Sequence, residues 1–261
     1  MTLLEKIQRG RAPRPPRILA YGVEGIGKST FASEAPRPVF IQTEDGLGQI
    51  ECDKFPLAES FEDVLQALGE LQAEQHDYET VVIDSLDWLE RLIWDAVCKE
   101  YGVKSIEKAD GGYARGYSHA LVYWRQIVDA LNALRDDRNM AVLLIAHTKV
   151  ERFEDPESSA YDRYSPRLHK HAAALICEWC DAVLFATRKI RTQTEDAGFN
   201  RKRTIANAIG KDGGERILRC VGGPSCIAKN RFGIVEELPL LWAAFMTALS
   251  NNQTSGEQTH G

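Results

Sequence analysis

A glycine-rich segment near the start of the chain has the residue types and the spacing that bind phosphate. Residues 22–29 read Gly-Val-Glu-Gly-Ile-Gly-Lys-Ser and match the pattern G-x-x-x-x-G-K-S/T. In this pattern the backbone N–H groups converge on phosphate oxygens, the lysine reaches the terminal phosphates and the hydroxyl ligates Mg²⁺. We therefore predict an ATP-binding loop formed by Gly22, Val23, Glu24, Gly25, Ile26, Gly27, Lys28, Ser29 and Thr30.

An aspartate at the end of an apolar run completes the predicted magnesium site. Val81, Val82 and Ile83 read as a buried strand, and Asp84 follows them directly. Because open α/β sheets bind their ligands at the carboxyl ends of the strands, we predict that Asp84 and Ser29 hold Mg²⁺ beside the phosphates. The alternative for Asp84 is a role as N-cap of the helix that follows it.

Two further positions at strand ends are candidates for catalysis. Glu44 follows the apolar run 39–41, and we predict that it polarises the water that attacks the γ-phosphate, with Asp45 as the second choice. Either carboxylate could instead be an exposed turn residue. His147 follows the run 141–146 and is predicted to sense the γ-phosphate, although an N-capping or packed histidine fits the same position.

Short apolar runs alternate with segments of helical periodicity along most of the chain. This alternation predicts an α/β fold with a mostly parallel central sheet flanked by helices. The expected strands are 18–21, 39–41, 81–83, 141–145, 182–185 and 216–221. The expected helices are 61–72, 85–101, 118–135 and 238–249.

The segments between and beyond these elements define the expected domain boundaries. Prolines between Arg11 and Arg17 make residues 1–17 an extended N-terminal arm or linker. We expect residues 18–249 to form one ATPase domain and the polar residues 250–261 a disordered tail. Inside the domain we expect a β-hairpin extension over 188–207 and long loops over 104–117 and 149–168.

The composition restricts the class of protein. The chain has 261 residues and a formal net charge of −6, which argues against indiscriminate coating of nucleic acid. Basic residues nevertheless cluster at 9–17, 188–191 and 201–203. No apolar run is long enough to cross a bilayer, and residues 1–10 lack the features of a secretory signal, so we expect a cytoplasmic protein with no membrane partner.

The cysteines are expected to be reduced thiols, because disulfide frameworks belong to short secreted domains. Cys177 and Cys180 have C-x-x-C spacing and could bind Zn²⁺ together with Cys220 and Cys226. We favour buried apolar roles, since Cys177 and Cys180 fall in a helical run that leads into a strand.

The order of these motifs resembles the RecA/RadA superfamily, and more narrowly the phage-encoded AAA-domain ATP-binding proteins of the Sak-type recombinase group. The resemblance rests on motifs at 22–29, 40–46, 81–85, 143–147 and 228–233, and on the stretches 161–170 and 178–185. It implies a RecA-like P-loop NTPase core and DNA-stimulated ATP hydrolysis in recombination, in the host cytoplasm for a phage-encoded chain. His147 stands where better-known recombinases have an amide.

The resemblance also implies assembly. In this family ATP lies between neighbouring subunits of a ring or filament, and a K-x-R pair reaches the neighbour's γ-phosphate. Lys229 and Arg231 occupy that position here, so they are expected to act catalytically in trans and to make hydrolysis depend on assembly. The alternative is a solvated basic turn. The implied partners are further copies of the chain, single-stranded DNA and a single-strand-binding protein.

By the same resemblance, the loops after Asp84 and His147 face single-stranded DNA. They combine cations that could contact phosphates with aromatic rings that could stack on bases. The predicted DNA-binding residues are Arg115, Lys149, Arg152, Arg163, Arg167 and Lys170. Acidic residues share the second loop, so a merely solvated surface is the alternative.

The sequence thus favours an ATP-hydrolysing, single-stranded DNA-binding recombination or annealing protein that acts as a ring or filament. One alternative is a RecA-fold DNA motor such as a helicase, which requires directional strand displacement. A second alternative is a nucleotide-gated loader that binds a protein in place of DNA, and it would show no salt-dependent binding to an oligonucleotide.

Overall fold

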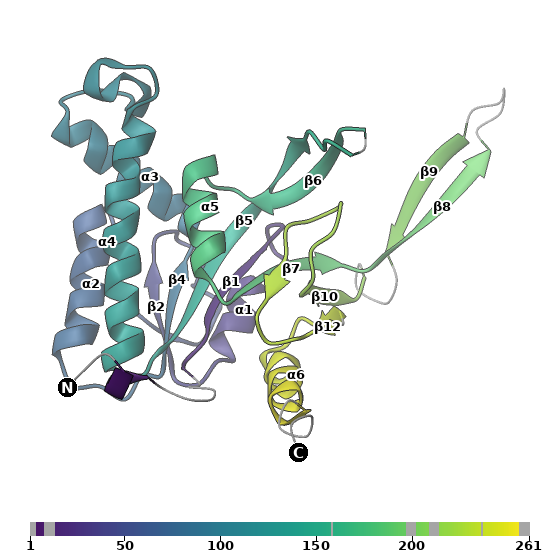
Figure 1. Ribbon diagram of the computed structural model, residues 1–261, viewed down its shortest axis with the longest axis horizontal. Helices are drawn as coiled ribbons and strands as arrows, with labels where there is room; N and C mark the ends of the chain where they lie inside the picture. Colours follow the sequence, from purple (N-terminus) through teal and green to yellow (C-terminus); the bar gives the residue numbers. More distant parts are fainter. Residues whose placement is uncertain are drawn as a thin grey trace.

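A ten-stranded, mostly parallel sheet forms the centre of the molecule in the computed structural model, which describes residues 4–7, 14–157, 159–196, 202–208, 214–235 and 237–255 (Figure 1). Its central strands run parallel. In spatial order these are β7 (Ala182–Arg188), β1 (Arg17–Gly22), β5 (Ala141–Phe153), β4 (Thr80–Asp84), β2 (Pro38–Gln42) and β3 (Asp53–Lys54).

Antiparallel strands extend this sheet at one side and at the end of β5. On one side, β10 (Arg216–Arg219) and β11 (Lys229–Asn230) pair with β7, and β12 (Glu237–Pro239) pairs with β10. At the end of β5, β6 (Tyr161–Pro166) folds back on the strand as a hairpin. The predicted α/β fold with a mostly parallel sheet is confirmed.

Alternate residues of the buried strands face two separate cores. In β1, Leu19 and Tyr21 join the core that is covered by α2 (Phe61–Ala73), α3 (Leu86–Glu100), α4 (Gly116–Asp137) and α5 (Lys170–Trp179). Ile18 and Ala20 join the opposite core, which is covered by α1 (Lys28–Ser33) and α6 (Trp242–Ser255). Strands buried on both faces read as continuous apolar runs, and the sequence prediction located them for this reason.

The β5–β6 hairpin corrects the prediction of a long loop over 149–168. Its strands carry charged residues, so they lack the apolar alternation that marks a half-buried strand. Opposite charges face each other across the ladder: Glu151 pairs in register with Arg163, and Arg152 with Asp162. Cross-strand pairs of this kind stabilise a sheet without contributing an apolar signal to the sequence.

The C-terminal helix differs from its prediction at both ends. Leu238 lies in β12, and α6 begins at Trp242, which packs with Phe245 against Phe31 of α1. The helix continues to Ser255, so the predicted tail is helical over 250–255. Residues 256–261 lie outside the described residues, as do 1–3 and 8–13 of the predicted N-terminal arm.

A second hairpin forms a sheet of its own. Strands β8 (Ile190–Asp196) and β9 (Lys202–Ala208) pair antiparallel from Ile190↔Ala208 to Asp196↔Lys202. Figure 1 shows this hairpin projecting away from the central sheet. The predicted hairpin extension is confirmed for the described strands.

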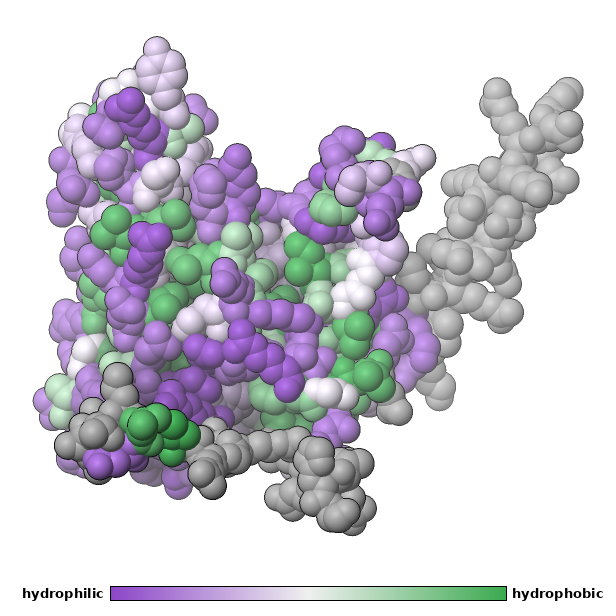
Figure 2. All heavy atoms as spheres, in the orientation of Figure 1, coloured by the Kyte–Doolittle hydropathy of each residue, from purple (hydrophilic) through white to green (hydrophobic). Residues whose placement is uncertain are grey.

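Short 3₁₀ turns lie at Leu4–Lys6 and Ile106–Gly111, the latter before α4 in the predicted loop 104–117. Within the described part of the chain, none of the helices has the length and apolar character that crossing a bilayer requires. The face drawn in Figure 2 is mostly hydrophilic over the tip of the β5–β6 hairpin.

Candidate nucleotide-binding site

The predicted phosphate-binding loop connects β1 to α1 at the carboxyl edge of the parallel strands. Gly25 and Gly27 have φ angles of 67° and 106°, which residues with a side chain rarely adopt. The loop borders a cavity of about 420 Å³, within the size range of small-molecule sites. The cavity is lined by Glu24, Gly25, Gly27, Lys28, Ser29, Thr30, Glu44, Gly46, Ile50, Asp84, His147 and Arg216. Gly22, Val23 and Ile26 complete the loop but are not among these lining residues.

Ser29 and Asp84 lie side by side at the cavity. Ser29 Oγ donates a 2.6 Å hydrogen bond to Asp84 Oδ2. Burial raises the pKa of the Asp84 carboxyl, and the hydrogen bond from Ser29 opposes that shift. The N-cap of α3 is Ser85, so Asp84 does not have the alternative capping role. A hydroxyl and a carboxylate beside a phosphate loop fit Mg²⁺, which when bound would neutralise charge on the phosphates.

Lys28 is held inside the loop. Its Nζ donates hydrogen bonds to the carbonyl oxygens of Gly22 at 3.2 Å and Val23 at 2.9 Å. Burial lowers the pKa of this ammonium, while the carboxylates of Asp84 and Asp87 act in the opposite direction. A partly desolvated ammonium attracts an anion more strongly than one in bulk water, so Lys28 is suited to contact phosphate.

Glu44 follows β2 and faces the same cavity. Its Oε2 accepts a hydrogen bond from Ser85 Oγ at 3.0 Å and lies 3.8 Å from Nδ1 of His147. Asp45 is exposed and does not belong to the cavity lining. The geometry therefore favours Glu44 over Asp45 as the carboxylate that would contact an attacking water.

His147 belongs to a buried network that the sequence did not predict. Asp87 Oδ1 accepts the His147 backbone N–H at 3.0 Å and lies 3.1 Å from its Nδ1, while Asp87 Oδ2 accepts a 2.7 Å hydrogen bond from Arg167. Burial would raise the pKa of Asp87, but the hydrogen bonds from His147 and Arg167 hold it well below its usual range. Arg167 also lies 3.4 Å from Glu24 of the phosphate loop. The network thus joins the cavity to the end of β6.

Lys229 and Arg231 lie near the amino ends of the parallel strands, whereas the cavity lies at their carboxyl ends. Lys229 pairs with Val183 near the start of β7, and the Arg231 backbone N–H donates to the Asp181 carbonyl. Arg231 Nη1 is 3.2 Å from the Asp181 carboxylate, and its side chain is 57% exposed. The structure does not bring this pair to the phosphate loop of its own chain.

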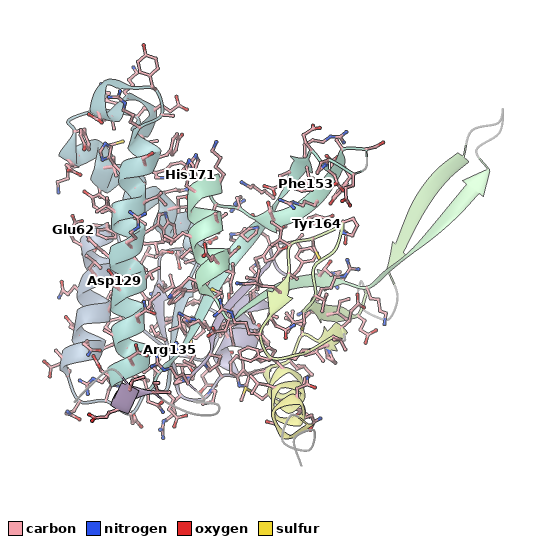
Figure 3. All side chains as sticks on the ribbon, in the orientation of Figure 1. Glu62, Asp129, Arg135, Phe153, Tyr164 and His171 are labelled. Atoms are coloured by element: carbon pink, nitrogen blue, oxygen red, sulfur yellow. The ribbon has the colours of Figure 1, made fainter. Side chains whose placement is uncertain are left out.

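Two of the predicted DNA-binding residues pair with carboxylates on the β5–β6 hairpin. Arg163 lies 2.9 Å from Glu151 and over the ring of Phe153, and Arg152 lies 3.5 Å from Asp162. Figure 3 shows Phe153 and Tyr164 on this hairpin. Each of these cations therefore has an acidic partner within the chain.

The other predicted DNA-binding residues are scattered. Arg167 is held in the buried network, and Lys149 Nζ donates to the Leu168 carbonyl at 2.6 Å. Arg115 lies at the start of α4, where its guanidinium contacts the Asp110 carbonyl at 3.4 Å. Lys170 begins α5 and is exposed. A shared DNA surface for all six residues remains a prediction.

The cysteines that could have formed a zinc site are free thiols. Burial raises the pKa of Cys177 and of Cys220 to about 11, which disfavours the thiolate that binds metal. Within the described ranges, no three side chains of His, Cys, Asp or Glu are grouped as metal ligands.

Comparison with known proteins places these features in a family context. A family model described as an AAA domain matches residues 14–232. The chain is also similar to the "SPbeta prophage-derived uncharacterized protein YorG" of Bacillus subtilis (strain 168), with 23% identity over 172 residues. That match covers 64% of this chain and 49% of the relative, so the chain spans about half the length of the relative it matches.

Proposed function

The chain belongs to the AAA domain family, and we propose on that premise that it binds and hydrolyses ATP in the cavity beside residues 22–30. The observation that carries this proposal is the 2.6 Å contact between Ser29, in the first turn of α1, and Asp84, at the end of β4, beside Lys28. A hydroxyl, a carboxylate and an ammonium in this arrangement are what nucleotide hydrolysis by a phosphate-binding loop requires.

Each residue has a separate role in this proposal. Lys28 and the backbone N–H groups of the loop hold the phosphates, and Ser29 and Asp84 hold Mg²⁺. Glu44 orients and polarises the attacking water, and the hydrogen bond from Ser85 fixes its carboxylate. His147 contacts the γ-phosphate. Through its bonds to Asp87, a change in the position of His147 on ATP binding would shift Arg167 and the end of β6.

We propose further that ATP is used by a ring or filament of this protein on single-stranded DNA, in recombination or annealing. The similarity to a prophage-derived protein supports a phage context. Lys229 and Arg231 would complete the cavity of a neighbouring copy, because they lie at the edge of the sheet away from their own cavity. A cation supplied in this way makes hydrolysis depend on assembly.

A second candidate function has one specific observation in its favour. Arg152 and Arg163 of the β5–β6 hairpin are paired with Asp162 and Glu151, so this hairpin offers little free positive charge to DNA. A nucleotide-gated loader that recognises a protein would tolerate such neutralisation. It would show no salt-dependent affinity for an oligonucleotide, whereas the DNA-binding protein would.

Two substitutions test the ATPase proposal. We expect Lys28→Ala to abolish ATP binding and to lower phosphate release by about 100-fold or more, because a charge-assisted contact to phosphate is removed. Arg231→Ala should stop hydrolysis while leaving ATP binding intact. Calorimetry with ATP and Mg²⁺ and a phosphate-release assay measure the two effects.

The exposed Lys99 of α3 provides the control, since Lys99→Ala removes a lysine distant from the cavity lining. Wild-type protein that gives no heat with ATP at any Mg²⁺ concentration would refute the ATPase proposal. Normal hydrolysis by Arg231→Ala would refute only the role in trans.

A further inference from the structure

Arg216 is a basic residue of the cavity that no sequence pattern indicated. It is the first residue of β10, which pairs antiparallel with β7 and lies beyond β1 in the sheet. It lines the same cavity as Lys28 and Asp84. A Cβ atom built on Gly27 would lie only 3.0 Å from Arg216 Nη1, so the guanidinium rests against the phosphate-binding loop itself.

The guanidinium of Arg216 has no counter-ion among the residues that the structure describes. Other arginines near the ends of the sheet are paired: Arg219 lies 3.0 Å from Glu237, Arg167 lies 2.7 Å from Asp87, and Arg231 lies 3.2 Å from Asp181. Arg216 is exposed, its ladder contacts are made by its backbone, and its side chain lines the cavity.

The charges that line the cavity explain why an anion would need this residue. Glu24, Glu44 and Asp84 contribute three carboxylates, and the fixed cations of the lining are Lys28 and Arg216. Lys28 is bonded to loop carbonyls on one side, and Arg216 lies against Gly27. The carboxylates outnumber the fixed cations by one, so losing either cation would make the lining still more negative and weaken its attraction for a nucleoside polyphosphate.

We propose that Arg216 binds phosphate oxygens of the nucleotide in its own subunit, as a second cation beside Lys28. The assignment rests on the proposed ATP-binding function and deepens it. A guanidinium presents several N–H donors in a planar fork that matches phosphate oxygens. The site would then use two cations in cis, Lys28 and Arg216, for binding, and the cations expected in trans for hydrolysis alone.

Arg216→Ala and Arg216→Lys test this assignment, with Arg219→Ala as a matched control on the same strand. Calorimetry with magnesium and three probes, ATP, ADP and inorganic tripolyphosphate, gives the dissociation constants. We expect Arg216→Ala to weaken all three by about 10- to 100-fold, as for loss of one charge-assisted contact, and Arg216→Lys to recover part of the affinity. Arg219→Ala should bind like wild type, and thermal unfolding should show that each variant is folded.

The probes separate the ways in which the assignment could fail. If Arg216→Ala binds ATP and tripolyphosphate as wild type does, Arg216 does not contact phosphate. If it loses affinity for ATP but keeps it for tripolyphosphate, Arg216 contacts the base or the ribose, and the assignment is wrong. If wild-type protein binds none of the probes, the ATP-binding proposal fails and the assignment fails with it.

Discussion

Two carboxylates of α3 that lie within one helical turn have pKa values shifted in opposite directions. Asp87 receives hydrogen bonds from His147 and Arg167, and these hold its pKa well below the usual range despite its burial. Glu90 is also buried, but among the described residues its hydrogen-bond donor is the backbone N–H of His169 alone, at 2.9 Å. Burial therefore prevails and raises the pKa of Glu90 to about 7.

The raised pKa of Glu90 predicts a specific dependence of stability on pH. Between its ordinary pKa of 4.5 and about 7, folded Glu90 holds a proton that the unfolded chain has released. The stability that the neutral carboxyl contributes is therefore complete at low pH and is lost as the pH rises through 7. The loss amounts to roughly 3 kcal/mol, at about 1.4 kcal/mol for each pKa unit.

Glu90→Gln keeps the side chain neutral and should remove this loss. We expect wild type to lose more free energy of unfolding than Glu90→Gln between pH 5 and pH 8, as measured by urea denaturation. Glu62→Gln, on the exposed surface of α2 (Figure 3), is the control and should follow wild type. Parallel curves for wild type and Glu90→Gln would show that Glu90 titrates as an ordinary glutamate.

Among single residues, the sequence could predict only those that belong to a local motif or stand at the end of an apolar run. Lys28 and Ser29 belong to a local motif, and Asp84 ends an apolar run, so the meeting of Ser29 with Asp84 was foreseeable. No sequence pattern of this kind indicates Asp87 or Arg216. Asp87 is one acidic residue of an amphipathic helix, and Arg216 reaches the cavity only because β10 pairs with β7.

The two hairpins differ in their balance of charge. Residues 149–168 contain the cations Lys149, Arg152, Arg163 and Arg167 against Glu151, Glu154, Asp155, Glu157 and Asp162. Residues 188–207 contain Arg188, Lys189, Arg191, Arg201, Lys202 and Arg203 against Glu195 and Asp196. The first segment has a net charge of −1 and the second a net charge of +4, so contact with a polyanion would favour the second hairpin.

We therefore expect the β8–β9 hairpin to contribute more to DNA binding than the β5–β6 hairpin. Arg191→Ser with Arg201→Ser should lower the slope of log affinity against log salt by roughly 1.4 units, since two cations no longer displace counterions from single-stranded DNA. The matched pair Arg152→Ser with Arg163→Ser should change the slope less, because these cations are already paired.

Fluorescence anisotropy with a labelled single-stranded oligonucleotide at several salt concentrations measures both slopes. If the Arg152 and Arg163 substitutions lower the slope more, DNA binds mainly at residues 149–168, as the sequence indicated. Wild-type protein without affinity for the oligonucleotide would favour the loader.

The elements show the same limit of sequence prediction as the residues. The parallel strands were predictable because they are buried on both faces and read as apolar runs. The β5–β6 hairpin was not, because ion pairs and the stacking of Tyr164 on Phe185 hold it in place of an apolar face. The end of α6 was missed because residues 250–255 are polar, although the helix that they extend packs its first turns on α1.

The whole molecule separates its two sets of cations along the direction of the parallel strands. The cavity lies where the parallel strands end, since Gly22 pairs with Ala186. Lys229 and Asn230 pair with Val183 and Ala182, where β7 begins. These levels are three to four residues apart along β7, or roughly 10 to 13 Å at the rise of a parallel strand. A side chain at one level is poorly placed to contact a phosphate at the other.

This separation predicts that two inactive variants restore activity to each other. In an assembly of like-oriented subunits, each cavity meets the Arg231 edge of a neighbour. Lys28→Ala lacks a working cavity but keeps Arg231, and Arg231→Ala keeps its cavity. In a 1:1 mixture that exchanges subunits at random, about one contact in four joins an intact cavity to an intact Arg231, so roughly a quarter of wild-type phosphate release should return. If Arg231 served the cavity of its own chain, the intact residues would never meet and the mixture would stay as inactive as its components.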